Sequence, residues 1–381
     1  MPGIGGGLEK PAGNFVEQPP CCTAAAMNAY FTPAKAAQVR NMRIMDAAHP
    51  GAIDEAAEIL RAGGLVAFPT ETVYGLGADA CNPLAVARIF EVKRRPEFDP
   101  IIVHVAHPAA AAEYGDVAGE LARQLVERFW PGPLTLVVRK TERVPSIVTA
   151  GLNTVAIRMP AHPAALALIR TAGRAVAAPS ANLFGYVSPT EAAHVAEQLG
   201  REVDLILDGG RCAVGIESTV LSLAGPAPQI LRAGGVTKEE IEQVIGRVEF
   251  GTAAPAAPES PGQLKRHYAT RTPLSIEEEE AVRADHRPGE KVGLLAFAAP
   301  PDPTKYAAVE VLSGSGNLRE AAANLFAALR RLDSLGLDRL VARPVPARGL
   351  GLAIMDRLRR CAAGSHQEDQ RDQDGRYVAG L

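Results

Sequence analysis

Two basic residues at the end of a predicted helix are the first candidates for binding an anionic substrate. Lys93 and Arg95 stand at the end of an apolar helical stretch, just before Pro96. The proline ends the helix, so both cations would lie beside the next strand. There they could neutralise a triphosphate, with arginine forming bidentate pairs. Basic residues in a last helical turn also complement the helix dipole, and from these residues alone that role is the more common one.

Two further polar residues stand inside apolar strands. His104 lies in the predicted strand Ile101–Val105, where a core histidine and a ligand-binding one fit the sequence equally well. Arg158 lies in the predicted strand Thr154–Met159, and an arginine among apolar residues requires an anionic partner. A substrate carboxylate or phosphate would serve, and so would a structural Asp or Glu.

Five more polar stretches stand at predicted strand ends, where ligand sites of open α/β sheets gather. Small residues in them would let a ligand approach the backbone, and a helix N-terminus collects phosphate. Each stretch alone could be a turn or a helix cap, but five in one domain are harder to explain that way. They are Pro69–Gly77 with Thr72, Ala178–Asn182 with Ser180, the capping box Ser188–Glu191, Glu217–Thr219 with Ser218, and Arg232–Gly235.

Common nucleotide-binding motifs are weak or missing. Gly75-x-Gly77-x-x-Ala80 matches the dinucleotide fingerprint, but the next helix begins only at Asn82-Pro83 and no acidic residue follows at the right distance. The sequence has no G-x-x-x-x-G-K-[ST] motif, which excludes an ordinary phosphate-loop ATPase. It also lacks the signals of a serine or cysteine catalytic triad. Because the dinucleotide fingerprint is poor, a nicotinamide-dependent oxidoreductase is a weak alternative.

Strands alternate with helices from about residue 50, which predicts an α/β protein. In the first part, helices are predicted at 53–60, from 83, at 116–129, 162–172 and from 188. Strands there are predicted at 65–68, 101–105, 134–138, 154–159, 175–178, 203–207, 219–223 and 229–231. A second α/β unit has predicted strands at 292–297, 308–312 and 340–345, and helices at 318–332 and 354–361.

Length and composition indicate a two-domain globular protein. The chain has 381 residues, with 47% hydrophobic and 22% charged residues and a net charge of -3. This balance argues against a protein whose main task is to bind nucleic-acid backbone. No apolar run approaches the roughly 20 residues of a membrane helix. The predicted parts are an extension at 1–42, a first domain at 43–248, a linker at 249–274, a second domain at 275–363 and a tail at 364–381.

Five scattered cysteines indicate reduced thiols and a cytoplasmic protein. The odd count and the lack of a C-x-x-C pair predict neither a disulfide framework nor a zinc site. The residues are Cys21, Cys22, Cys81, Cys212 and Cys361.

Taken together, the motifs resemble those of the threonylcarbamoyl-AMP synthase family in its two-domain version. The resemblance runs from about residue 43 to 361 and keeps the motifs in order. The matching stretches are Phe68–Gly77, Lys93-x-Arg95-Pro96, Ile102–Val105, Phe129–Leu136, Ala178–Asn182, Leu207–Gly210, Glu217–Val220, Ile230–Gly235, Ser260–Tyr268 and Gly349–Arg357.

The resemblance implies a fold and a reaction. The fold would be a twisted, mixed α/β sheet domain with a large concave active site, followed by a smaller Rossmann-like α/β domain. Family members combine L-threonine, bicarbonate and ATP into threonylcarbamoyl-AMP and pyrophosphate, with Mg²⁺ accompanying the nucleotide. A separate transferase uses the product to modify adenosine 37 of tRNA.

The resemblance also assigns roles to individual residues, carried over by motif. The catalytic cations would be Lys93 and Arg95. The threonine pocket would consist of Thr72, His104, Arg158, Ala178 and Ser218. ATP would contact Arg95, Asp99, Thr154, Ser180, Ser188, Arg232 and, from the linker, Tyr268 as a lid.

Two positions depart from the family pattern. Asp99 stands where the family usually has asparagine, and a carboxylate beside the phosphates would repel them unless it is protonated, turned away or bound to magnesium. Thr270 stands where the linker usually has proline, which could loosen the lid.

Two rival functions remain. A non-enzymatic module that binds tRNA or duplex RNA would fit a basic concave surface, although the acidic balance and few interleaved aromatics count against it. Another carbamoyl-adenylate synthase that starts from carbamoyl phosphate would resemble the chain in one domain only.

Overall fold

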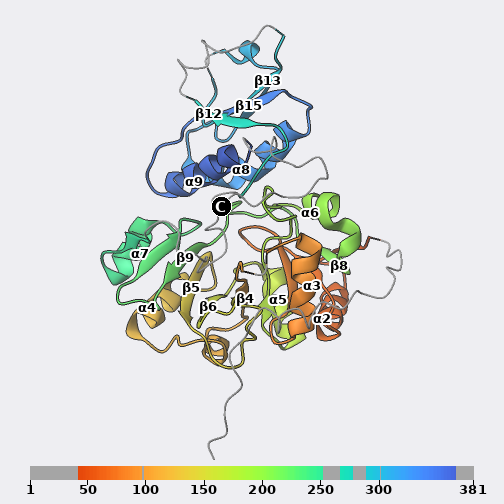
Figure 1. The fold of residues 1–381 in the computed structure, drawn as a ribbon, viewed down its shortest axis with the longest axis vertical. Helices are drawn as coiled ribbons and strands as arrows, with labels where there is room; N and C mark the ends of the chain where they lie inside the picture. The colour runs from red at the N-terminus through yellow and green to blue at the C-terminus, as the bar shows by residue number, and fades with distance from the viewer. Residues whose placement is uncertain (1–41, 97, 252–266, 278–288, 301, 366–381) are drawn as a thin grey trace, which may run out of the picture. The chain divides into compact units, whose positions relative to one another are not determined.

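Two β-sheets, each with its own helices, make up the fold (Figure 1). The computed structural model describes residues 42–96, 98–251, 267–277, 289–300 and 302–365, all within one compact unit, Gln38–Leu381. The predicted extension up to residue 41, the linker residues 252–266 and the tail from residue 366 lie outside the described residues.

The first sheet has eleven strands in the order β1-β8-β2-β3-β7-β4-β6-β5-β9-β10-β11. Its pairings are mixed: β4 and β6 run parallel, for example, while β7 runs antiparallel to both β3 and β4. The strands are β1 (Ile44–Asp46), β2 (Val66–Phe68), β3 (Gly75–Asp79), β4 (Ile102–His104), β5 (Leu134–Arg139), β6 (Thr154–Arg158), β7 (Val176–Ala177), β8 (Leu205–Asp208), β9 (Thr219–Ser222), β10 (Gln229–Arg232) and β11 (Glu249–Phe250).

Helices cover this sheet, and local sequence explains several of their ends. Asn82 caps α3 by accepting hydrogen bonds from the amides of Leu84 and Ala85. In Figure 1, α2 packs against α5, and α4 packs against α7. The helices are α2 (Ala52–Arg61), α3 (Pro83–Lys93), α4 (Glu120–Phe129), α5 (Pro163–Ala172), α6 (Ala192–Leu199) and α7 (Lys238–Ile245), with short 3₁₀ turns at Pro108–Glu113 and Gly200–Glu202.

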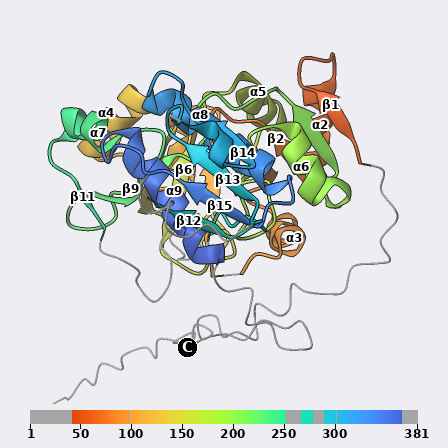
Figure 2. The same cartoon turned by 90° about the horizontal axis from the view of Figure 1, so that it is seen from above.

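The second sheet is smaller and entirely parallel, in the order β12-β15-β13-β14. Seen from above in Figure 2, these strands lie next to one another with α8 and α9 beside them. Their bounds are β12 (Leu274–Ile276), β13 (Val292–Ala296), β14 (Ala308–Val311), β15 (Arg339–Ala342), α8 (Leu318–Asp333) and α9 (Leu350–Ser365), with a 3₁₀ turn at Pro303–Lys305.

The predicted fold class, a mixed sheet domain followed by a smaller parallel α/β domain, is confirmed. The predicted helix at 116–129 begins later, at Glu120, and the one at 354–361 begins earlier, at Leu350. Among the α-helices and strands of the described residues, five had no counterpart in the prediction: β1, β3, β11, β12 and α7.

The prediction that Ser188 caps a helix is wrong. Helix α6 begins at Ala192, and its N-cap residue Glu191 makes no capping hydrogen bond through its side chain. The hydroxyl of Ser188 instead donates a hydrogen bond of 2.6 Å to Glu217. An N-cap serine would accept a hydrogen bond from a backbone amide, whereas this hydroxyl donates to a buried carboxylate, so Ser188 takes part in a tertiary contact.

None of the helices within the described ranges is long and apolar enough to cross a membrane.

Candidate active site

A pocket lies where several strand ends of the first sheet meet. Eight of the predicted site residues line it: Thr72, Arg95, His104, Arg158, Ala178, Ser180, Ser218 and Arg232. The other lining residues are Thr70, Val73, Gly75, Ile102, Pro179, Glu217 and His267.

Lys93 and Arg95 both point into the protein because of the backbone between them. Arg94 closes α3 in a left-handed conformation with φ of 51°, so its own side chain is exposed while its neighbours are buried. The Nζ atom of Lys93 donates to the carbonyl oxygens of Ser180, at 2.6 Å, and of Asn182. Lys93 thus fixes the Ala178–Asn182 loop from behind and does not line the pocket itself.

Arg95 is held by the loop that follows it. Its Nε donates to the carbonyl of Asp99 at 3.1 Å, and one Nη donates to the carbonyl of Pro100 at 2.9 Å. The same Nη lies 2.9 Å from a carboxylate oxygen of Asp99. The guanidinium is therefore oriented before any ligand arrives, and it already has an anionic neighbour.

Asp99 is fully buried behind Arg95 and does not line the pocket. Burial raises the pKa of its carboxyl group, and the positive charges of Arg95, Lys93 and Arg232 act in the opposite direction. A carboxylate so placed reduces the net positive charge that Arg95 offers to a phosphate.

Arg158, at the end of β6, has the structural partner that its sequence environment required. One Nη donates to Glu71 at 2.6 Å, the other donates to the hydroxyl of Thr72 at 2.9 Å, and Nε donates to the carbonyl of Gly132 at 3.2 Å. The second oxygen of Glu71 accepts the amide of Ala161. These bonds place the guanidinium and the Thr72 hydroxyl side by side at the wall of the pocket.

His104 is a neutral side chain at the pocket wall. Burial, followed by the positive charge of Arg158, lowers the pKa of its imidazole to about 3. Its Nδ1 atom has no hydrogen-bond partner among the described residues. Register pairs it with Arg158 on β6, so a polar group on a ligand could reach both.

Arg232 and Ser218 form one corner of the pocket. Arg232 donates to the carbonyl of Ser218 through Nε at 3.1 Å and through Nη at 2.9 Å. The hydroxyl of Ser218 lies 2.8 Å from that of Thr135. A side chain at Gly234 would place its Cβ 2.3 Å from the backbone of Ser218, so glycine permits the close approach of the two loops.

Besides Lys93 and Asp99, three more predicted site residues do not line the pocket. Thr154 begins β6, at the opposite end of that strand from Arg158. Ser188 is fully buried against Glu217. Tyr268 is fully buried and stacks on Phe326 of α8, with ring centroids 5.4 Å apart.

Two ionisable pocket residues were not predicted to bind substrate. His267 lines the pocket, and its ring centroid lies 4.1 Å from that of Tyr268. Burial, with Arg95 and other nearby cations, lowers its pKa well below the ordinary value. Glu217 lines the pocket as well. Both belong to stretches that already stood out in the sequence, Ser260–Tyr268 and Glu217–Val220, so the motifs carried a signal for them.

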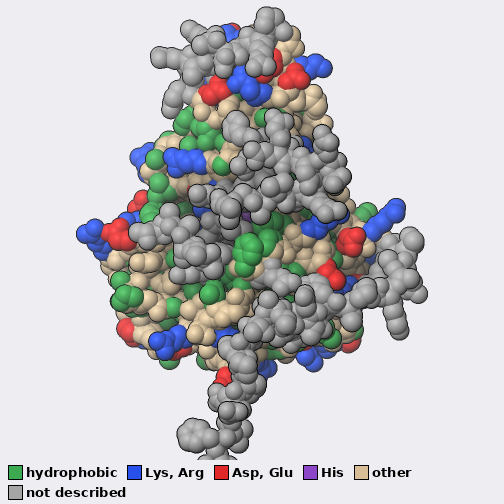
Figure 3. All heavy atoms as spheres, viewed as in Figure 1, with side chains coloured by type: hydrophobic (Ala, Val, Ile, Leu, Met, Phe, Trp, Pro, Cys, Tyr) green, Lys and Arg blue, Asp and Glu red, His purple; other side chains and the backbone are tan. Residues whose placement is uncertain are grey.

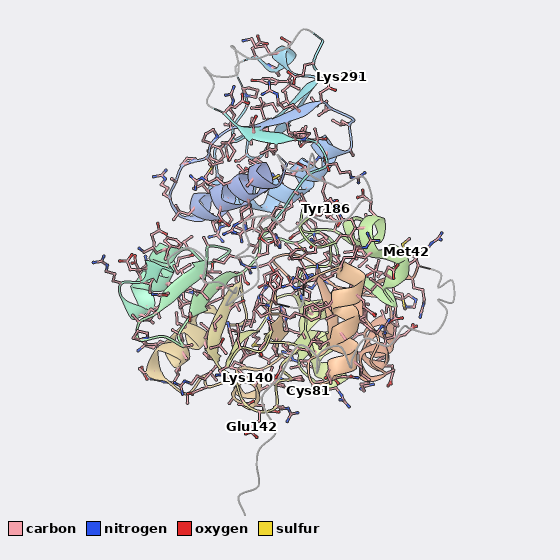
Figure 4. All side chains as sticks on the ribbon, in the orientation of Figure 1. Met42, Cys81, Lys140, Glu142, Tyr186 and Lys291 are labelled. Atoms are coloured by element: carbon pink, nitrogen blue, oxygen red, sulfur yellow. The ribbon has the colours of Figure 1, made fainter. Side chains whose placement is uncertain are left out.

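Tyr186 forms a bridge with Ala269, directly after Tyr268, and in Figure 4 it lies at the opposite end of the first domain from Cys81. Within the described ranges, no group of three or more His, Cys, Asp or Glu side chains is placed to hold a metal ion. The pocket instead presents three guanidinium groups, from Arg95, Arg158 and Arg232.

Fold and pocket together define a mixed α/β protein with an arginine-lined pocket at its strand ends. Two family models match the chain: Sua5_yciO_yrdC, described as telomere recombination, over residues 58–234, and Threonylcarbamoyl-AMP synthase, C-terminal domain, over residues 236–363.

Relatives over most of the chain agree with these matches. Threonylcarbamoyl-AMP synthases of Pyrococcus abyssi and Bacillus subtilis are 44% and 45% identical to it over 322 residues, covering 81% and 82% of this chain and 93% of each relative. The crystal structure of P. abyssi Sua5 complexed with L-threonine superposes with a TM-score of 0.77 at 42% identity, covering 82% of this chain and 94% of that one. The chain belongs to the threonylcarbamoyl-AMP synthase family. Membership confirms the predicted enzyme class, a nucleotidyltransferase.

Proposed function

We propose that this chain forms L-threonylcarbamoyladenylate from L-threonine, bicarbonate or CO₂, and ATP, with release of pyrophosphate. The product would serve N6-threonylcarbamoyladenosine modification at position 37 of tRNA. The observation that carries the proposal is a pocket in which Arg95, Arg158 and Arg232 converge with small residues. Relatives that match most of the chain are named threonylcarbamoyl-AMP synthases, and the P. abyssi Sua5 structure is a complex with L-threonine.

The threonine half of the pocket would be the wall around Arg158. Its guanidinium could take the substrate carboxylate while keeping its bond to Glu71, and Thr72 and Ser218 offer hydroxyls nearby. Neutral His104 could accept or donate one hydrogen bond without adding charge. Ala178 has a small side chain, so a ligand can approach the backbone there.

The ATP half would be the wall formed by Arg95, Ser180 and Arg232. Magnesium would enter as part of the ATP substrate, since triphosphate oxygens are ligands that it prefers. Four residues assigned to ATP do not line the pocket: Asp99, Thr154, Ser188 and Tyr268. A direct contact with ATP would require these side chains to move, or the nucleotide to extend beyond the pocket. We retain them as proposed ATP-binding residues on the resemblance alone.

The proposed chemistry needs positioning more than a protein nucleophile. The amino group of threonine and bicarbonate give a carbamate and water. A carbamate oxygen then attacks the α-phosphorus of ATP, the bond to the β-phosphate oxygen breaks, and pyrophosphate leaves with that electron pair. Pre-oriented cations such as Arg95 stabilise the charge that develops on the phosphates, and Lys93 holds the adjoining loop in place.

A separate tRNA threonylcarbamoyl transferase would take up the product. Direct binding of RNA as the main function has less support. On the face drawn in Figure 3, basic and acidic side chains of the described residues are interspersed, and the net charge of the chain is -3.

The test is pyrophosphate release from ATP by purified protein, with threonine and bicarbonate each present or omitted. The proposal predicts release only when both are present with Mg²⁺. Release that needs neither substrate would indicate plain nucleotide hydrolysis and would contradict it. Salt-sensitive binding of RNA without any turnover would favour the RNA-binding alternative.

A further inference from the structure

One side chain of the second domain reaches the pocket region of the first. Arg357, on α9, is fully buried. Its Nε donates to a carboxylate oxygen of Glu217 at 3.1 Å, and one Nη donates to the carbonyl of Ala233 at 2.6 Å. Glu217 lines the pocket, and Ala233 adjoins Arg232. Helix α9 therefore contacts both loops that form the Arg232–Ser218 corner.

Glu217 connects Arg357 to a second polar group. Its two carboxylate oxygens have different partners: one accepts Arg357, and the other accepts the hydroxyl of Ser188 at 2.6 Å. The three side chains form a continuous buried chain from α9 to the wall of the pocket. All three side chains are buried too deeply for water to replace a lost hydrogen-bond partner.

The charges around Glu217 come from several elements. Arg357 and Asp356 belong to α9, Arg232 ends β10, and Tyr268 lies in the linker. Burial alone would raise the pKa of Glu217, but Arg357 first, then Arg232 and the Ser188 hydroxyl, lower it overall. Removing Arg357 would therefore leave a buried carboxylate that has lost its strongest stabilising charge.

Other contacts fix α8 and α9 against the same side of the first domain. Arg330 donates to the carbonyl of Val187, directly before Ser188. The guanidinium of Arg357 lies 5.4 Å from the ring centroid of Tyr268, which stacks on Phe326. The apolar cluster around Phe326 also includes Val73, Val187 and Ile216 of the first domain.

We infer that Arg357 is a positioning residue through which the second domain holds the Glu217–Ser188 pair, and so the shape of the pocket, in place. The inference rests on the proposed function, because pocket shape is read out through turnover. Arg357 would not touch substrate. It would act by keeping Glu217 ionised and oriented, with both of its oxygens engaged.

The test compares four variants for threonine- and bicarbonate-dependent pyrophosphate release across pH, with ATP and threonine varied separately. R357Q removes the charge, and R357K keeps a charge near Glu217. E217Q/R357Q replaces the ion pair with two neutral amides. Arg359→Gln is the matched control, because Arg359 is an exposed arginine on the same helix.

We expect R357Q to lower kcat/KM for ATP about tenfold at neutral pH and to recover as pH rises and Glu217 ionises. R357K should move the pH profile back toward wild type, and E217Q/R357Q should lose the alkaline shift. R359Q should match wild type. If R357Q does not fold, R357K and the double variant supply the same comparison.

Other results would overturn the inference. A folded R357Q with wild-type kinetics, or with reduced turnover but an unshifted pH profile in all variants, would mean that Arg357 is only a structural brace. A wild-type protein without substrate-dependent turnover would instead contradict the proposed function, and this role of Arg357 with it.

Discussion

Replacing Asp99 with asparagine should strengthen ATP binding. The carboxylate lies 2.9 Å from Arg95 and is fully buried, so it offsets the positive charge of that guanidinium. A unit charge about 6 Å from a phosphate contributes about 3 kcal/mol at an effective dielectric constant of about 20. Protonation of Asp99, whose pKa is raised by burial, reduces this contribution. We expect a gain of about 1.4 kcal/mol, or about tenfold tighter binding.

The assay is calorimetric titration with α,β-methylene-ATP and Mg²⁺, at several pH values. Protonating Asp99 removes its negative charge, as the substitution does, so both changes should strengthen ATP binding. Wild-type affinity should therefore increase as pH falls from neutral toward the raised pKa of Asp99, and D99N should lack this increase. Asp79→Asn is the control, because Asp79 is also buried and pairs with Arg174 at 2.7 Å but does not line the pocket. A folded D99N that binds the analogue no better than wild type, or more weakly, would refute the electrostatic reasoning.

Three further substitutions follow from the same structure. Arg95→Ala should lower kcat/KM for pyrophosphate release by about 100-fold or more with the fold intact. Near-normal turnover would show that the reaction does not need Arg95. His104→Asn should reduce the loss of stability at acid pH. The pKa of His104 is about 3 in the folded protein and 6.5 ordinarily, so the unfolded chain binds the proton first as pH falls. Wild type therefore loses about 1.4 kcal/mol of unfolding free energy per pH unit below 6.5. Denaturant titrations of both proteins at pH 7 and pH 5 measure it, and equal losses would count against a buried neutral His104. Tyr268→Ala should cost about 3–5 kcal/mol of stability because a fully buried ring is removed; a small change in the denaturation midpoint would contradict its core position, and unchanged kinetics would argue against the linker as a lid.

Local signals in the sequence were enough for most helices and for the cationic residues of the site. Asn82 predicts the start of α3 because its side chain and the following proline act within one turn. Arg158 predicts an anionic partner because an unpaired guanidinium among apolar residues is costly. The sequence could not decide whether that partner was a substrate or a side chain, and the structure supplies Glu71.

Features that depend on distant contacts could not be predicted. Strand β3 contains two glycines, which disfavour a strand, yet Gly77 is required because a Cβ there would lie 2.8 Å from Phe68 and from Val176. Ser188 has the sequence of a helix cap, but its partner is 29 residues away, and Arg357 reaches Glu217 across 140 residues. Only folding brings these groups together.

The central claim is that the pocket joins threonine, bicarbonate and ATP into one molecule. Mass spectrometry of the reaction mixture, with ¹³C-bicarbonate and ¹⁵N-threonine, tests it most directly. The account predicts a threonylcarbamoyl-AMP species that carries both labels, formed in step with pyrophosphate and reduced strongly in R95A. Pyrophosphate or ADP without a doubly labelled adenylate would contradict it.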